Sequence, residues 1–452
     1  MKNILLSLLL CIFSGVVCEA VEVVYPRAQN VTINSGSTFF VGNSQKDFKI
    51  NGQKIPRNKK GAFAYVVELN VGENVFTFDD SIQKQIYKIT RPAPKTYSGT
   101  SSEQIDFSDY KIVMTSSDNI PLRSTPVDAG INRLSHLPSG VMLTVSGEKN
   151  GFYKVLLDNN ETGWVAKSSV IAVKENPAAN LKGYDYIDTD DFFTFVFHLD
   201  KKVPFVIEEG STMSLKLYNV NNYAPYEMQF PYSEAAGSEK LYGYSGEFAG
   251  NDFIWKIRKP LKIDQKHPLK GVKIAIDAGH GGSECGAISC FGEKEKDINL
   301  SISKYLRKEL QKRGADVYMT RTHDTYHGLR ERIDNANEKN SVILISIHGN
   351  ALPDNLDPNK NKGTSIFYYY DMAKPLAESI LKTMTKQLGM NNDKIRQASL
   401  ALVRNTNALS ILIEVGYLIN PDDSVLLREA DFQKAAAVSI ADGIENYLLS
   451  RK

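Results

Sequence analysis

The sequence lacks a surplus of charge of either sign. It has 54 Lys and Arg residues against 52 Asp and Glu residues, which leaves a formal net charge of +2. No basic stripe stands out, so the sequence predicts no nucleic-acid partner. Beyond its N-terminus the chain also lacks an apolar stretch long enough to span a membrane, which predicts no stable membrane span.

What is present is the composition of an ordinary folded protein. Hydrophobic residues make up 42% of the chain and charged residues 23%, which are common values for globular domains. The length of 452 residues is enough for about three or four domains. A sizeable hydrophobic core is therefore expected.

The N-terminus has the pattern of an export signal. Lys2 supplies a positive charge, Ile4–Phe13 form an apolar segment, and Cys18–Ala20 end it with small residues before a cut. The apolar segment is too short for a transmembrane helix. We therefore expect residues 1–20 to be a signal peptide and the exported protein, which starts near Val21, to act in the periplasm, the cell envelope or outside the cell.

Cysteine is scarce. Of the four cysteines, Cys11 and Cys18 would leave with the signal peptide, and Cys285 and Cys290 would remain close together in one loop. In an oxidising compartment these two residues could form a disulfide or stay as free thiols. A zinc-thiolate role is a third interpretation.

Three breaks rich in turn residues divide the chain, at Arg91–Ser102, Lys174–Lys182 and Lys259–Lys270. Before the third break, short alternating apolar runs predict β structure. After it, strand and helix patterns alternate. The predicted fold is multidomain, with all-β N-terminal modules followed by a C-terminal α/β domain whose mostly parallel sheet is flanked by helices. The expected domains are residues 21–95, 108–175, 183–258 and 270–452.

Three apolar runs of the last domain each end at a residue able to bind a metal or move a proton. Val272–Ile276 leads to His280, Val342–Ile347 leads to His348, and Leu409–Ile413 leads to Glu414. Short β-branched runs of this kind predict strands buried on both faces of a parallel sheet. Because ligand sites lie outside the carboxyl ends of such strands, the sequence predicts a catalytic metal site there.

Glu295 is the fourth candidate. It stands just before an amphipathic helix, because Ile298, Ile302, Leu306 and Leu310 recur on one helical face. A helix start would hold its carboxylate rigidly beside the edge of the sheet. Each candidate also has a structural interpretation: His280 could cap a turn, His348 could be a core histidine, and Glu295 could stabilise the helix start.

From Lys270 to Lys452 the chain resembles the zinc-dependent N-acetylmuramoyl-L-alanine amidases of the type 3 family. The resemblance rests on an ordered set of motifs: Asp277–Gly282, Glu295–Leu300, Met319–Arg321, Leu329 with Arg332, Ala336–Asn337, Ser346–Asn350 and Leu412–Asn420.

The resemblance implies a role for each candidate. It implies one zinc ion held by His280, Glu295 and His348, with Glu414 as the acid/base residue that takes the proton of the attacking water. The implied reaction is hydrolysis of the amide between N-acetylmuramic acid and L-alanine in peptidoglycan. The alternatives are a stem-peptide peptidase with the same zinc site, and a non-catalytic wall-binding or adhesive protein. No substrate-binding residue is identified, and the sequence does not say whether a protein activator is needed.

A second pair of histidines has the spacing of a zinc helix but lacks its glutamate. His323 and His327 are four residues apart. They fall between an expected strand at Asp316–Thr320 and an expected helix at Leu329–Glu338. We therefore expect a surface role on a connecting loop.

The upstream segments carry weaker resemblances. Phe48–Gly52 and Leu69–Asn74 resemble bacterial immunoglobulin-like or cadherin-like modules. The residues from Asp109 to Val173, with Asn150-Gly151 as a hairpin turn and Trp164 as a core or ligand-contacting aromatic, resemble the bacterial SH3 fold, which commonly binds cell-wall peptide. The residues from Tyr184 to Ile257 resemble β-sandwich modules that precede envelope amidases, and His198 is expected on the surface of a strand.

One loop departs from some members of the amidase family. Certain envelope amidases carry a long insertion after the second histidine motif, which plugs the site until an activator moves it. Here only Ala351–Lys362 separates that motif from Gly363. The loop is too short for such a helix, so the site is expected to be open unless another domain covers it.

Overall fold

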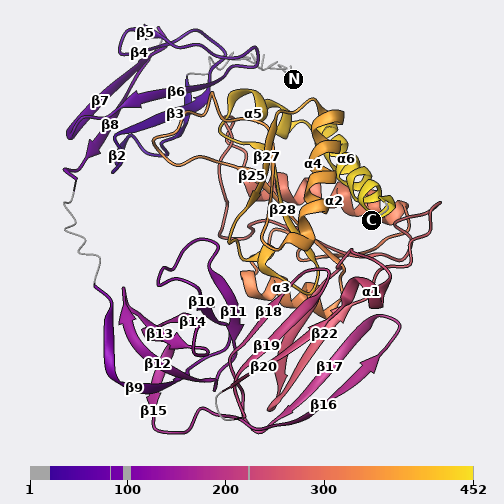
Figure 1. Cartoon of the computed structure of the whole chain (residues 1–452). Coiled ribbons are helices and arrows are strands. Elements are labelled where there is room, and N and C mark those ends of the chain that lie inside the picture. Colours follow the sequence, from indigo (N-terminus) through magenta and orange to yellow (C-terminus); the bar gives the residue numbers. More distant parts are fainter. Residues whose placement is uncertain (1–20, 82, 95–102, 222–223, 451–452) are drawn as a thin grey trace, which may run out of the picture.

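The computed structural model describes residues 21–81, 83–94, 103–221 and 224–450 (Figure 1). The expected signal peptide, with Cys11 and Cys18, lies outside the described residues. Within them, three β modules are followed by a C-terminal domain of strands and helices. No helix in the described part of the chain is both long and apolar enough to cross a membrane.

The first module, residues 21–94, is built from two sheets. Strands β1, β3 and β6 form one, and β2, β8, β7, β4 and β5 form the other in that order. Phe40 packs edge-on against Phe76 and Phe78 between them, so aromatic side chains fill the core. The strands are β1 (Glu22–Tyr25), β2 (Asn30–Thr32), β3 (Ser37–Asn43), β4 (Lys49–Ile50), β5 (Gln53–Lys54), β6 (Ala62–Glu68), β7 (Gly72–Asp79) and β8 (Lys84–Arg91).

The second module, residues 103–173, has one seven-stranded sheet in the order β11-β10-β14-β13-β12-β9-β15. Asn150 and Gly151, both at positive φ, form the expected turn between β12 and β13. Trp164 on β14 is buried, which favours its core interpretation. The strands are β9 (Ile105–Thr115), β10 (Ile120–Arg123), β11 (Arg133–Leu137), β12 (Met142–Lys149), β13 (Phe152–Leu156), β14 (Thr162–Ala166) and β15 (Val170–Val173), with the short helix η1 (Lys167–Ser169) before β15.

The third module, residues 181–258, is a pair of sheets, β16-β17-β22-β21 and β18-β19-β20. It shares one hydrophobic cluster with the second module. His198 lies on β17 with its side chain 38% exposed between Asp185 and Asp252, as expected for a surface residue. The elements are β16 (Leu181–Asp188), β17 (Phe192–Leu199), β18 (Phe205–Glu208), β19 (Met213–Val220), β20 (Ala224–Phe230), α1 (Tyr232–Ala236), β21 (Tyr244–Ala249) and β22 (Asp252–Arg258).

The C-terminal domain, residues 270–450, is built on a six-stranded sheet in the order β24-β23-β25-β28-β26-β27. Its strand pairs are parallel except β26 with β28. The elements are β23 (Lys273–Ala278), α2 (Glu295–Lys312), β24 (Asp316–Met319), α3 (Leu329–Glu338), β25 (Ile343–Asn350), β26 (Thr364–Tyr368), η2 (Asp371–Ala373), α4 (Lys374–Leu388), β27 (Asn392–Gln397), η3 (Leu402–Arg404), β28 (Leu409–Tyr417), α5 (Pro421–Arg428) and α6 (Ala430–Leu449).

The central strands carry apolar side chains on both faces, which explains why helices cover both faces of this sheet. Ile274 and Ile276 of β23 belong to the large cluster formed with α2, α4 and α6. Ala275, between them, joins Ala336 of α3 in a smaller cluster on the other face. Successive side chains of a strand point to opposite faces, so continuously apolar strands require helices on both sides.

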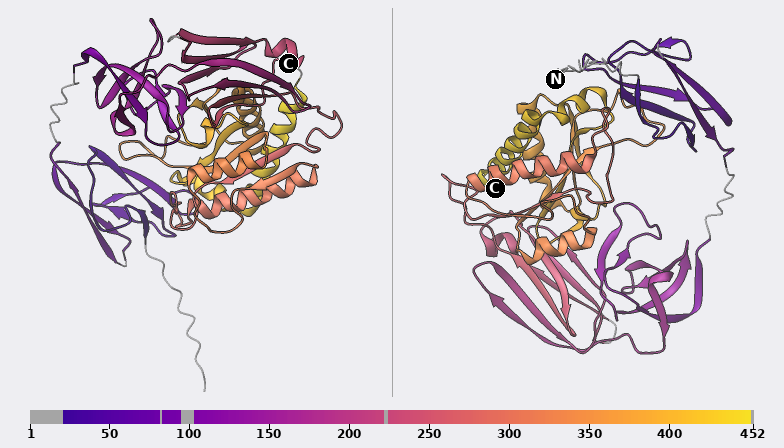
Figure 2. Two further views of the ribbon diagram at one scale, coloured as in Figure 1. Left: turned by 90° about the horizontal axis from the view of Figure 1, so that it is seen from below. Right: turned by 180° about the vertical axis from the view of Figure 1, so that it is seen from behind.

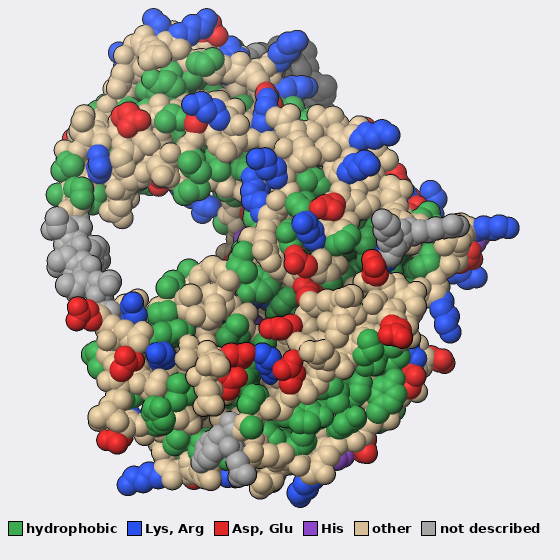
Figure 3. Space-filling view, in the orientation of Figure 1, with side chains coloured by type: hydrophobic (Ala, Val, Ile, Leu, Met, Phe, Trp, Pro, Cys, Tyr) green, Lys and Arg blue, Asp and Glu red, His purple; other side chains and the backbone are tan. Residues whose placement is uncertain are grey.

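The three β modules lie at two different sides of the C-terminal domain. The first module lies at one side of it, and the second and third modules lie at another (Figures 1 and 2). The space-filling view shows an opening bordered by the first module, the second module and the C-terminal domain (Figure 3).

Candidate metal centre

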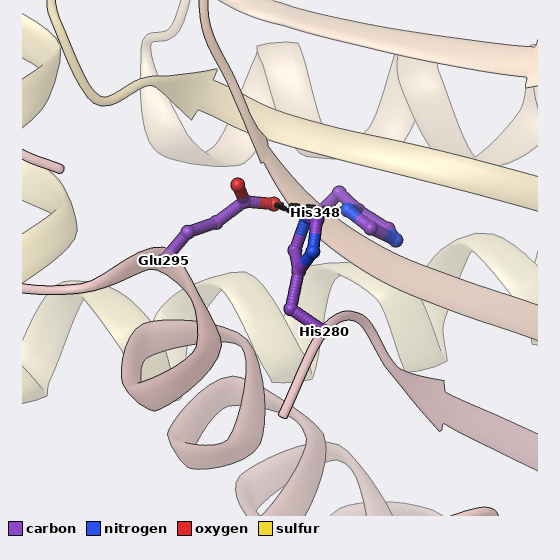
Figure 4. Close-up of side chains that lie close together, drawn as sticks. All are labelled: His280, Glu295 and His348. Carbon is purple, nitrogen blue, oxygen red and sulfur yellow. Dashed lines mark hydrogen bonds and ion pairs between the residues drawn. The ribbon is translucent and has the colours of Figure 1, made fainter. Parts of the chain in front are cut away.

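Three of the predicted residues meet in one cluster at the edge of the C-terminal sheet. His280 follows β23, Glu295 is the first residue of α2, and His348 lies near the end of β25. One potential ligand atom from each lies within 4.8 Å of the other two. Figure 4 shows the three side chains pointing toward one another from these separate elements.

Glu295 joins the two histidines. Its Oε1 atom lies 3.2 Å from Nε2 of His280 and 2.9 Å from Nδ1 of His348. The two imidazole rings stand edge to face with centroids 4.9 Å apart. Three donor groups that face one point at these distances could bind a single small cation.

Glycines allow the cluster to be this compact. A Cβ atom at Gly279 would overlap the ring of His348, and one at Gly286 would overlap Glu295 and the ring of His280. His280 itself has a φ of 59°, a left-handed conformation that is uncommon for a residue with a side chain. The turn after β23 therefore holds His280 in an unusual backbone conformation next to its partners.

A buried charge network supports the loop that carries His280. Asp277 accepts hydrogen bonds from Arg332 at 2.8 Å, Thr320 at 2.6 Å and Ser346 at 2.6 Å. Arg332 also donates to the carbonyl oxygen of His280 at 2.9 Å. Burial alone would raise the pKa of Asp277, but Arg332 and the two hydroxyl groups lower it, so the network holds an ionised carboxylate.

Burial and the contacts between neighbouring side chains set the ionisation of the cluster. Burial acts to raise the pKa of Glu295, but the hydrogen bonds from His280 and His348 lower it well below its usual range. For His348, burial acts to lower the pKa, and the neighbouring carboxylates of Glu295 and Glu414 outweigh it and raise the pKa. Glu295 is therefore a carboxylate ready to bind a cation.

Glu414 is set apart from the other carboxylate. It lies on β28 directly beside His348 in the register of the two strands. Burial raises the pKa of Glu414 to about 7. Its Oε2 atom is buried and has no hydrogen-bond partner among the described residues. Near neutral pH Glu295 is ionised and Glu414 is close to its pKa, so the two glutamates are suited to different tasks.

A family model described as N-acetylmuramoyl-L-alanine amidase matches residues 274–446. Over these residues the C-terminal domain is similar to the N-acetylmuramoyl-L-alanine amidases. The matched segment contains all four residues of the site. We therefore call the C-terminal domain the amidase domain.

Individual relatives match the same region. Probable cell wall amidase LytH of Staphylococcus aureus is 36% identical over 185 residues, which cover 40% of this chain and 60% of LytH. This chain thus spans 60% of the length of that curated relative. Among solved structures, N-acetylmuramoyl-L-alanine amidase AmiC2 of Nostoc punctiforme is 32% identical with a TM-score of 0.38, and the match covers 40% of this chain and 99% of that one. An N-acetylmuramoyl-L-alanine amidase from Clostridium difficile 630 is also 32% identical, with a TM-score of 0.38, and the match covers 40% of this chain and 100% of that one.

The second histidine pair lies outside the cluster of the amidase domain. His323 and His327 are on the loop between β24 and α3, as expected. His327 pairs with Glu331 at 2.6 Å, which leaves its Nδ1 atom engaged. The single group of potential ligands found among the described residues consists of His280, Glu295 and His348.

The two remaining cysteines of the amidase domain are free thiols. Cys290 is buried, and its backbone N–H donates to Ser424 at 3.0 Å. Cys285 is partly exposed in the loop between His280 and Glu295. Neither belongs to the ligand cluster, so the structure favours the free-thiol interpretation.

Sequence reasoning missed the supporting roles of two arginines. Arg321 donates to the carbonyl oxygens of Gly279 at 3.0 Å and Lys296 at 2.7 Å, which ties the His280 turn to the start of α2. Arg332 performs a similar task from α3. The sequence motifs contain both residues but give them no role. The available signal was Asp277, an aspartate directly after an apolar run. A carboxylate buried at the end of a strand needs a cation nearby.

Proposed function

We propose that this protein is a zinc-dependent peptidoglycan hydrolase that cuts the amide bond between N-acetylmuramic acid and L-alanine. One observation carries the proposal. In a domain of the amidase family, two histidines and an ionised glutamate form a compact cluster, and a second glutamate with a raised pKa lies beside it.

The residues of the cluster fit zinc. Catalytic zinc sites take three protein ligands, usually imidazole nitrogens and carboxylate oxygens, and keep one further position for water or substrate. His280, Glu295 and His348 supply that set. Bound zinc would polarise the substrate carbonyl and lower the pKa of a water molecule to about 7.

The chain's own groups would do the rest. Glu414, whose pKa burial raises to about 7, can accept a proton from water and return it to the leaving amine near neutral pH. The ligands stay in place because Arg321 and Arg332 hold the His280 turn by its carbonyl groups and because α2 holds Glu295. The nitrogen of L-alanine leaves as a free amine.

The parts upstream of the amidase domain are proposed to serve export and wall contact. Residues 1–20 would direct the chain out of the cytoplasm. The seven-stranded second module would act as an SH3-like domain that binds cell-wall peptide, supported by its hairpin at Asn150-Gly151. The first and third modules would correspond to immunoglobulin-like and envelope-amidase-associated β modules.

The proposal is tested with the purified exported chain and a soluble muramyl pentapeptide. The expected result is the appearance of a new alanine N-terminus, its loss after chelation, and its return when zinc is added back. His348→Ala should prevent both zinc binding and recovery. His323→Ala is the matched control, since it changes a histidine outside the cluster. Turnover that survives complete removal of metal would overturn the proposal.

A further inference from the structure

The first module packs against the chain segments that carry the metal site. Phe39 and Val41 of β3 form one buried cluster with Cys290 and Ile419 of the amidase domain. Cys290 lies on the loop just before Glu295, which begins α2. Ile419 lies shortly after Glu414, just past the end of β28. The contact therefore involves the surroundings of two of the four site residues.

The loop after His348 is also held by this module. Asp354 on that loop accepts hydrogen bonds from Tyr25 at 2.7 Å and from Thr38 at 2.5 Å. The backbone N–H of Asn355 donates to the carbonyl oxygen of Ser37 at 3.2 Å. Burial, together with the hydrogen bond to Asp354, raises the pKa of Tyr25, so the phenol keeps its proton and stays a donor.

Further hydrogen bonds complete the contact on either side. Asn43 donates to the carbonyl oxygen of Cys290 at 3.1 Å, and Asn58 donates to that of Pro421 at 2.7 Å. In the reverse direction, Asn359 donates to the carbonyl oxygen of Ala64 at 3.1 Å. Apolar packing and polar contacts in both directions indicate a fixed placement of the module beside the site.

That placement brings a cation to the loop that borders the metal centre. Nη2 of Arg27, in the segment between β1 and β2, lies 3.4 Å from Sγ of Cys285. The next residue, Gly286, lies directly against Glu295 and the ring of His280. Arg27 is exposed, and in the described part of the chain it forms no ion pair. A guanidinium with only a thiol beside it can still bind a carboxylate through two parallel hydrogen bonds.

We propose that Arg27 is a specificity-determining residue, which binds a free carboxylate of the stem peptide next to the scissile amide. The inference rests on the proposed function for its class of substrate. In this arrangement the first module forms part of the substrate site. The enzyme would then prefer a stem whose second residue is D-glutamate over one whose second residue is D-isoglutamine, because only the former offers the charge.

The test uses two muramyl tripeptides that differ only in whether the carboxyl group of the second residue is free or amidated. Binding is measured by calorimetry on the zinc-loaded exported chain with the Glu414→Gln substitution, which should retain the site without turnover. Adding Arg27→Gln should raise the dissociation constant of the acid form roughly tenfold, as expected for loss of an exposed, two-pronged interaction with a charged group. The dissociation constant of the amidated form should not change.

Two further variants separate recognition from structure. Arg27→Lys should restore part of the preference, because it keeps the charge and loses the two-pronged geometry. Lys88→Gln, on β8 of the same module, removes one exposed positive charge that pairs with Glu73, and it should leave both dissociation constants unchanged. Equal weakening of the two ligands by Arg27→Gln would overturn the inference, as would no weakening of either.

Two outcomes distinguish a failure of the role of Arg27 from a failure of the amidase function. Wild-type protein that cleaves both tripeptides with equal kcat/KM would overturn the role of Arg27 and leave the amidase function standing. A preference for the acid form in binding that Arg27→Gln abolishes, without any cleavage by the wild-type protein, would support the role of Arg27 and overturn the amidase function.

Discussion

At the scale of single residues, the site gives two glutamates different electrostatic surroundings. Glu295 contacts both histidines, and these contacts lower its pKa. Glu414 has no such partner, and burial raises its pKa to about 7. The first is suited to bind a cation at any physiological pH, and the second is suited to exchange a proton near neutrality.

This difference predicts that Glu414→Gln keeps its zinc and loses turnover. The amide has nearly the same shape as the carboxylate but cannot accept a proton, so the rate should fall by about 10²–10⁴-fold, the usual contribution of general acid–base catalysis. Glu295→Gln should lose metal together with activity, because it weakens a ligand. Zinc content and muropeptide release are measured on both variants. If Glu414→Gln were empty and Glu295→Gln fully loaded, the two roles would have to be exchanged.

The buried network around Asp277 predicts a cost in stability. Asp277→Asn leaves Arg332, which is 2% exposed, without its charged partner, and such changes cost about 3–5 kcal/mol. Because the pKa of Asp277 is lowered in the folded protein, its contribution is present above the unfolded pKa and is lost as the pH falls through the folded value. Urea unfolding of the amidase domain at pH 7 measures the difference from wild type. A difference within experimental error would show that the network does not stabilise the fold.

At the scale of elements, the apolar pattern of the sequence predicted helices and strands that have a buried face. The stripe from Ile298 to Leu310 lies on α2, which begins at Glu295, and α3 has the expected bounds Leu329–Glu338. The three runs that end near the site are β23, β25 and β28. The periodicity of a helix or a strand does not encode how far apart two elements lie. The placement of Glu295 beside His348 was therefore predicted only through the family motifs.

Other elements carried no readable signal. Strand β27 (Asn392–Gln397) is a polar edge strand that pairs on one side with β26, so it has no need of an apolar run. The antiparallel pairing of β26 with β28 depends on chain direction, which side-chain pattern does not reveal. The contacts of the first module with the loop at Asp354 also escaped prediction, because they join residues over 300 positions apart.

A carboxylate from the third module caps the start of η2, and this contact should depend on pH. Glu209 accepts hydrogen bonds from the backbone N–H groups of Asp371 and Met372. Burial raises its pKa from 4.5 to about 7. The folded protein therefore holds a proton there that the unfolded chain releases earlier, and stability falls as the pH rises between these two values.

Glu209→Gln should remove that dependence. The amide oxygen can still accept a hydrogen bond and has no charge to bury, so above pH 7 the variant should gain up to about 3 kcal/mol over wild type. The advantage should shrink as the pH is lowered from 7 to 4.5, and it should be absent below 4.5. Melting curves across this range measure it, with the neighbouring Glu208→Gln on β18 as the control. Parallel pH profiles for Glu209→Gln and wild type would contradict the prediction.

At the scale of the whole molecule, the amidase domain has its own core but shares its surface. The large cluster of β23, β25, β28 and the covering helices lies almost entirely within the domain. The first module adds the separate cluster around Phe39 and Cys290. The third module is attached through Tyr244, whose N–H donates to the carbonyl oxygen of Thr406 at 2.7 Å, and through Arg258, which donates to Asn340 at 2.6 Å.

This arrangement predicts that a fragment of residues 262–452 folds and cleaves soluble muropeptides alone. Its own core is complete, but removal of the first module uncovers Ile419 and leaves Asp354 without Tyr25 and Thr38. The fragment should therefore melt at a lower temperature and have a higher KM than the exported chain. Circular dichroism and steady-state kinetics measure both. A fragment that fails to fold would show that the β modules complete the core.

The central claim is that the amide between N-acetylmuramic acid and L-alanine is the bond that is cut. Mass spectrometry of purified peptidoglycan digested with the zinc-loaded exported chain tests it most directly. The account predicts intact stem peptides with L-alanine at their N-terminus, together with glycan strands whose lactyl groups end in free carboxylates. Glycan that still carries L-alanine, with shortened peptides released, would contradict it and identify a stem-peptide peptidase instead.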